Sequence, residues 1–133
     1  MLVSCIDQVS ADGILGAAEF DSMPTFSGLE AMAQIAALHV RHCLDFARHA
    51  FLLKINSGQW PAQRVLHGCC RLSADLYSRS SSTFAYQTKV RSPAGMVLNA
   101  DLLIGTIPFD GNFREELLKA HYRKLFTRLR KNR

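Results

Sequence analysis

The segment Gly28–Ala47 constrains the fold most, because it has the pattern of a helix that is apolar on nearly every side. Apolar or small residues recur there at spacings of three and four, as along one face of a helix. They are Leu29, Met32, Ala33, Ala36, Val40 and Cys43, and the remaining circumference holds Ile35, Ala37, Leu38 and Phe46. Such a helix is buried, so the rest of the chain must surround it.

The segments around this helix have the pattern of strands. Short apolar runs and alternation predict strands at Leu2–Val9, Ile14–Phe20, Phe51–Trp60, Val65–Tyr77, Thr83–Val90 and Met96–Ile107. We expect Asp21–Ser27 to be a loop and a bulge to interrupt the third strand near Asn56–Gly58. A sheet curved around one buried helix is the hot-dog architecture, so we predict an α+β hot-dog domain at residues 1–111. Its open sheet edge and helix flank predict a dimer.

The positive charge of the chain lies at its C-terminal end. The 133 residues carry a formal net charge of +5, of which residues 112–133 carry +6 and residues 1–111 carry −1. We expect residues 112–133 to form an extra, basic C-terminal helix. Its expected apolar stripe consists of Phe113, Leu117, Ala120, Leu125 and Leu129.

Composition and simple motifs exclude several classes of protein. With 48% hydrophobic and 20% charged residues, the chain is not typical of disordered proteins. No apolar run approaches the ~20 residues that span a bilayer, and the N-terminus lacks the basic region of a secretory signal. Four cysteines do not make a disulfide scaffold, so we expect a reduced, cytoplasmic setting.

The stretch Met23–Gln34 (MPTFSGLEAMAQ) carries a recognisable pattern. It resembles the loop and central helix of hot-dog 3-hydroxyacyl-ACP dehydratases, in which Met-Pro-Gly leads into Gly-Leu-Glu/Asp-Ala-Met-x-Gln. The likeness is closest to the short dehydratase-like proteins of aryl-polyene-type gene clusters. The opening segment Met1–Val9 also resembles the first strand of that family.

The resemblance implies a site for a thioester. Glu30 matches the catalytic carboxylate, Gln34 the helix glutamine, and Thr25 the residue whose backbone N–H polarises the thioester carbonyl, with Gly28 beside them at the substrate. The substrate implied is a 3-hydroxyacyl chain on the phosphopantetheine arm of an acyl carrier protein, with no cofactor or metal of the enzyme's own. Elimination of water needs an acid and a base and a dipole on the thioester oxygen.

One catalytic group of the family is missing from the sequence. The family's loop histidine precedes the carboxylate by about fourteen residues, where this chain has Gly16, and no histidine occurs between Met1 and Gln34. A partner subunit could supply one, and His49 and His67 are the first candidates in a homodimer. The family's glycine is also replaced by Thr25.

Several motifs have a structural interpretation as well. Ser27 and Glu30 have the spacing of a capping box, which would make Glu30 a helix cap instead of a catalyst. His39, His42 and Cys43 share a helix turn and could hold zinc, but a third and fourth ligand are not evident, so helix packing is the alternative. Cys69 and Cys70 are adjacent on a strand and should point to opposite faces.

The basic helix has three interpretations. An acidic acyl carrier protein could dock on its cationic side chains. They are Arg114, Lys119, Arg123, Lys124 and Arg128. Alternatively, this face is only solvated, with a frayed C-terminus. A nucleic-acid partner is disfavoured, because the sequence lacks an aromatic-interleaved or recognition-helix motif.

Two functional hypotheses follow. In the first, the protein dehydrates 3-hydroxyacyl thioesters for fatty-acid or polyene biosynthesis, with Glu30 as acid and base. In the second, it is a catalytically weak or inactive hot-dog subunit that dimerises with a histidine-bearing dehydratase. A weaker third hypothesis, a nucleic-acid binder, predicts salt-sensitive binding that depends on residues 112–133.

Overall fold

The computed structural model describes residues 1–59, 61, 64–110 and 112–132, with the side chains of 112–114 excluded. Its described part contains six strands and two helices in the predicted order. The strands are β1 (Val3–Val9), β2 (Gly13–Pro24), β3 (Arg48–Gln59), β4 (Val65–Arg79), β5 (Thr83–Arg91) and β6 (Val97–Pro108). The helices are α1 (Phe26–Cys43) and α2 (Asn112–Lys131). No helix of the described residues is both long and apolar enough to cross a membrane.

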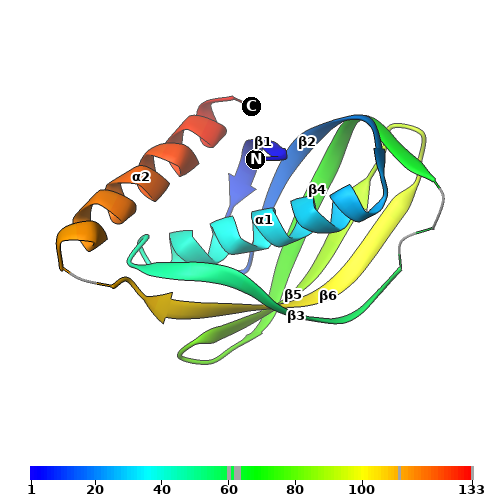
Figure 1. The fold of residues 1–133 in the computed structure, drawn as a ribbon. Helices are drawn as coiled ribbons and strands as arrows, with labels where there is room; N and C mark the ends of the chain where they lie inside the picture. Colours follow the sequence, from blue (N-terminus) through cyan, green and yellow to red (C-terminus); the bar gives the residue numbers. More distant parts are fainter. Residues whose placement is uncertain (60, 62–63, 111, 133) are drawn as a thin grey trace.

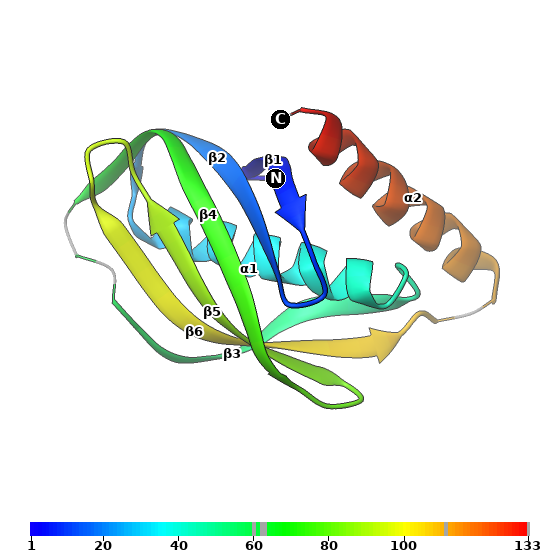
Figure 2. The same cartoon turned by 180° about the vertical axis from the view of Figure 1, so that it is seen from behind.

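The six strands form one antiparallel sheet in the order β1-β2-β4-β5-β6-β3. The sheet curves around α1, which lies along its concave face, and α2 lies on the outside near β1 (Figures 1 and 2). This confirms the predicted α+β architecture. The edge strands are β1 and β3, and α2 packs against β1. Among the described residues, no strand pairs with the outer edge of β3.

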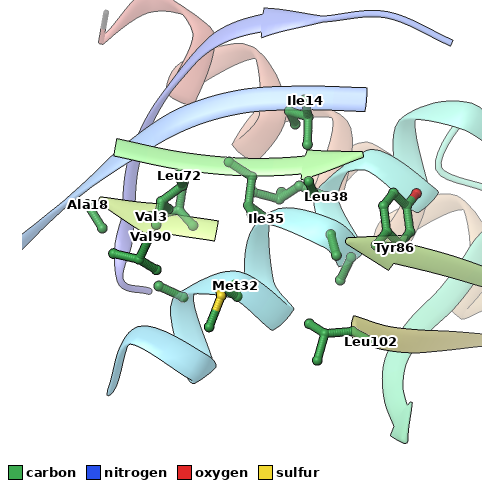
Figure 3. Close-up of a cluster of buried hydrophobic side chains, with 14 of the residues drawn as sticks. Val3, Ile14, Ala18, Met32, Ile35, Leu38, Leu72, Tyr86, Val90 and Leu102 are labelled. Carbon is green, nitrogen blue, oxygen red and sulfur yellow. The ribbon is translucent and has the colours of Figure 1, made fainter. Parts of the chain in front are cut away.

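The core lies between α1 and the sheet (Figure 3). From the helix, Met32, Ile35 and Leu38 point toward the sheet and are at most 1% exposed. Tyr86 and Leu102 meet them from β5 and β6 and are also completely buried. The alternation of buried and exposed residues along β4 and β5 is that of strands with one face on a core.

Two predicted boundaries are wrong. The expected loop Asp21–Ser27 is mostly strand, because β2 continues to Pro24 past an irregularity at Ser22, whose φ is 50°. Helix α1 ends at Cys43 and not at Ala47, because Asp45 and Phe46 adopt positive φ values that turn the chain into β3. The expected bulge in the third strand is confirmed by a register shift between Ile55 and Ser57. Trp60 lies outside the described residues.

The apolar stripe of α2 differs from the predicted one. The buried or half-buried apolar and aromatic side chains are Leu118, Tyr122, Leu125, Phe126 and Leu129. Of the predicted stripe, Leu117 and Ala120 are exposed, and the side chain of Phe113 lies outside the described residues. Leu125 and Leu129 of the predicted stripe are confirmed. The prediction is wrong at Leu117 and Ala120 because Tyr122 and Phe126, which pack against the end of α1, were left out of the helix pattern.

Candidate functional site

A mostly apolar groove runs along the face of α1 that the sheet does not cover. Its volume is about 610 Å³, within the usual range of ligand sites. Side chains of α1, β3, α2 and the N-terminus line it. They are Met1, Phe26, Leu29, Glu30, Ala33, Gln34, Ala37, Arg41, Ala50, Phe51, Leu52 and Tyr122. The groove thus contains two of the predicted site residues, Glu30 and Gln34.

Thr25 fixes the start of α1. It is the N-cap residue and is buried, and its Oγ1 donates a hydrogen bond to the Pro61 carbonyl oxygen at 2.9 Å. The Thr25 carbonyl oxygen accepts the Gly28 N–H at 2.9 Å. The first turn of the helix is therefore held in place by both the side chain and the backbone of Thr25.

The capping-box interpretation of Ser27 and Glu30 is wrong. The helix begins at Phe26, so Ser27 is its second residue and Glu30 lies in the second turn. No side chain caps the helix, and Ser27 is buried. The helix begins earlier than predicted because Thr25 is anchored to Pro61. Glu30 consequently has no capping role and is available for another one.

Glu30 and Gln34 lie one turn apart and face the groove. Glu30 is exposed and has no hydrogen bond or ion pair with the described residues. The Gln34 Oε1 accepts hydrogen bonds from the backbone N–H groups of Leu2 at 2.8 Å and Val3 at 3.3 Å. Gln34 thereby ties β1 to the helix, and only its amide NH₂ remains to meet a ligand.

Gly28 has a packing role that the sequence did not reveal. A Cβ at this position would lie 2.8 Å from Leu66 Cδ1 and 2.9 Å from Leu98 Cδ2. Both leucines are completely buried. The glycine therefore lets the first turn of α1 lie directly against β4 and β6, which fixes the position of Glu30 relative to the sheet.

No histidine lines the groove. His67 is on the exposed face of β4, where its Nδ1 lies 3.2 Å from the backbone nitrogen of Ser22. His49 packs edge-on against Phe109, with ring centroids 4.4 Å apart. Neither of the two candidate histidines reaches Glu30 within one protomer, so the partner that the resemblance implies is not found there.

The predicted alternative of a zinc site on α1 is not supported. The His39 Nε2 lies 2.8 Å from the Ser10 carbonyl oxygen and its Nδ1 lies 2.5 Å from the Tyr86 hydroxyl, so both ring nitrogens are used. His42 instead stacks on Phe126. The described residues contain no group of three side chains suited to a metal ion. Burial lowers the pKa of His39 and raises the pKa of Tyr86, so both are held neutral.

The basic residues of α2 divide into two groups. Lys119 and Arg123 pair with Asp45 at 3.5 and 3.2 Å, and the hydrogen bond from Arg123 followed by the charge of Lys119 lowers the pKa of that carboxyl. Lys124 and Arg128 are exposed beside a shallow apolar hollow on the same helix. The side chain of Arg114 lies outside the described residues. The helix is thus docked on the domain, and only part of its charge faces outward.

Two groove residues, Arg41 and Tyr122, were missed by the sequence reasoning. The guanidinium carbon of Arg41 lies 4.3 Å from the centroid of the Tyr122 ring. A signal for Arg41 was present, because Glu30, Gln34, Ala37 and Arg41 follow one another at spacings of four, three and four. No sequence signal placed Tyr122 near them, since it lies on another helix.

Comparison with solved structures gives similar folds at low identity. The dehydratase heterocomplex ApeI:P from Xenorhabdus doucetiae has a TM-score of 0.69 and 12% identity, over 88% of this chain and 87% of that one. A thioesterase from Staphylococcus aureus has a TM-score of 0.65 and 12% identity, over 77% of this chain and 92% of that one. A thioesterase from Haemophilus influenzae has a TM-score of 0.58 and 20% identity, over 80% of each chain.

The chain has the hot-dog fold. No family model matches its sequence, and no curated protein does. The similar structures therefore show the fold alone, and the chemistry must be argued from the groove.

Proposed function

We propose that this hot-dog protein binds 3-hydroxyacyl thioesters carried by an acyl carrier protein and dehydrates them at Glu30. The observation that carries the proposal is the free carboxylate of Glu30 in an apolar groove, one turn from the start of α1. The Met23–Gln34 resemblance to dehydratases, closest to those of aryl-polyene-type clusters, supports this choice over other thioester chemistry. The dehydratase heterocomplex among the similar folds is consistent with it.

The elimination can be written with the groups at this end of the groove. The Glu30 carboxylate takes the proton from C2 of the acyl chain, the C2–H electron pair forms the C2–C3 double bond, and the C3–O bond breaks. The hydroxyl that leaves C3 takes this proton from the Glu30 carboxyl and departs as water, so that Glu30 returns to its carboxylate form. The amide of Gln34 would orient the carboxyl or a water. The resemblance gives the role of polarising the thioester carbonyl to the backbone N–H of Thr25, which is buried and is not among the residues that line the groove.

A dimer would complete the groove. Phe51, Leu52, Leu53 and Ile55 of β3 are between 36% and 52% exposed, and β6 is the one described strand that pairs with β3. A long apolar edge strand of this kind is suited to pairing with another chain. Because Phe51 and Leu52 also line the groove, a second hot-dog subunit on β3 would cover it and exclude water from Glu30.

The absence of a histidine from the groove favours a second candidate function. The protein would then be a weak or inactive subunit that contributes Glu30 and the acyl groove to a heterodimer with a histidine-bearing dehydratase. Lys124 and Arg128, the outward-facing charges of α2, would help to dock the acidic carrier protein in either case.

The test compares wild type, Glu30→Gln and the matched control Glu19→Gln, whose residue lies on the exposed face of β2. Each is assayed with 3-hydroxyacyl-ACP, alone and after coexpression with a histidine-bearing hot-dog dehydratase. The proposal expects 2-enoyl product from wild type and the control, and a loss of at least a hundredfold in Glu30→Gln. Activity only in the coexpressed complex selects the second candidate, and full activity of Glu30→Gln excludes the role given to Glu30.

A further inference from the structure

Arg41 places a positive charge in the groove without a counter-ion. Its Nη2 donates a hydrogen bond to the Ala50 carbonyl oxygen at 3.1 Å, and its guanidinium lies over the Tyr122 ring. The buried Nε has no hydrogen-bond partner among the described residues. No carboxylate of the described chain pairs with Arg41, although Lys119 and Arg123 nearby both pair with Asp45.

This arrangement is unfavourable unless an anion binds there. A charge withdrawn from water is costly when it is not paired, and burial lowers the pKa of Arg41 for that reason. Arginine nevertheless stays protonated in proteins. The planar fork of a guanidinium suits a carboxylate, which it can bind through two parallel hydrogen bonds. A single guanidinium also matches the single charge of a carboxylate better than the double charge of a phosphate.

The position of Arg41 defines the shape of the ligand. Arg41 follows Glu30 by eleven residues on the same helix face, which at 1.5 Å per residue separates their backbones by roughly 16 Å. Between them the groove is lined by Gln34, one turn from Glu30, and then by the apolar side chains of Ala33, Ala37 and Phe51. A ligand that fills the groove therefore has its reacting group at Glu30, an apolar middle, and an anionic end at Arg41.

We propose that Arg41 and Tyr122 form a carboxylate-recognition site, and that the groove takes acyl chains whose far end carries a carboxylate. The inference rests on the proposed function for the thioester at Glu30, and adds the chemical class of the acyl chain. Arg41 is then a specificity-determining residue, because an unsubstituted alkyl end would leave its guanidinium unpaired. The Tyr122 ring holds the guanidinium flat beside the ligand.

The probe is monomethyl dodecanedioate, which has an ester at one end and a carboxylate at the other, and its dimethyl ester lacks the charge. Calorimetric titrations compare both esters on wild type, Arg41→Met and the matched control Arg91→Met, whose residue is exposed on β5. Wild type and the control should bind the half-ester about tenfold to a hundredfold more tightly than the diester, as expected for a hydrogen bond between charged groups. Arg41→Met should bind the two esters equally.

Equal binding of the two esters by wild type, or no binding of either, overturns the proposal. So does a preference for the half-ester that survives in Arg41→Met. If Arg41→Met does not fold by circular dichroism, Arg41→Lys replaces it and should lose most of the preference, because lysine keeps the charge without the fork. Glu30→Gln separates the two proposals, because it should keep the half-ester preference and lose dehydration. A retained preference together with full dehydration in this variant refutes only the chemistry assigned to Glu30.

Discussion

Replacing Phe126 with alanine tests whether α2 is a docked element of the fold or a loosely attached basic tail. The Phe126 side chain is 5% exposed. Its ring is nearly parallel to that of His42, with centroids 4.9 Å apart, and meets Phe46 edge-on at 5.6 Å. These contacts join α2 to the end of α1 and to the turn that leads into β3.

The size of the effect follows from this burial. Phenylalanine-to-alanine replacements in cores cost about 3–5 kcal/mol, and each aromatic pair contributes about 0.5–1.5 kcal/mol beyond its buried area. Because α2 lies at the surface and can partly repack, we expect the lower end, about 3 kcal/mol. For a chain of this size that lowers Tm by roughly 10 °C.

Urea unfolding and thermal unfolding of Phe126→Ala measure the loss. The control is Leu117→Ala in the same helix, whose side chain is 65% exposed and should cost less than about 0.5 kcal/mol. Hydrogen exchange should show the largest loss of protection in α2. Equal effects of the two variants would refute the reasoning, because they would mean that α2 has no specific packing face.

Three further outcomes are expected. Gly28→Ala should destabilise by about 1–3 kcal/mol in urea, because the new methyl group overpacks two buried leucines and outweighs the gain in helix propensity; an unchanged midpoint would show that the first turn can shift. Burial lowers the pKa of His39 in the folded state. Below about pH 6.5 the unfolded state therefore binds a proton more readily than the folded state, and the free energy of unfolding decreases as the pH is lowered. Urea midpoints measured between pH 7 and pH 5 should show this slope in wild type and a smaller one in His39→Gln, and equal slopes would contradict the assignment. Arg71 and Arg91 lie directly opposite each other across β4 and β5, so Arg91→Glu should stabilise by about 0.2–1 kcal/mol at low salt and less at high salt; a loss of stability at low salt would count against this.

Much of the fold could be predicted because each long segment of the sequence shows a single hydrophobic periodicity, either that of a helix or that of a strand. The apolar pattern of α1 and the alternation in β4 to β6 gave the element order and the wrapped architecture. The boundaries that failed, at Pro24 and Cys43, depend on positive φ values at Ser22, Asp45 and Phe46. Serine and phenylalanine rarely adopt positive φ, and aspartate does so more often but is also common elsewhere, so the local signal was weak.

The candidate site could be predicted only for residues that belong to one local motif on one helix. Glu30 and Gln34 came from a local motif, and both line the groove. Arg41 has the same helical spacing but lacks the motif, and Tyr122 reaches the groove only because α2 folds back over the end of α1. The capping interpretation of Glu30 failed because Thr25 is fixed by Pro61, a contact between residues 36 positions apart.

The packing of α2 on β1 has a consequence for synthesis of the chain. The strand β1 lies at an edge of the sheet, and it is made before the helix α2 that covers it, with five strands and α1 made in between. The Asn132 side chain donates to the Ser4 carbonyl oxygen at 3.1 Å, so this edge group is satisfied by a residue 128 positions later in the chain. The nascent chain must therefore keep an open strand edge until translation reaches α2, and that interval is when it is most exposed to aggregation.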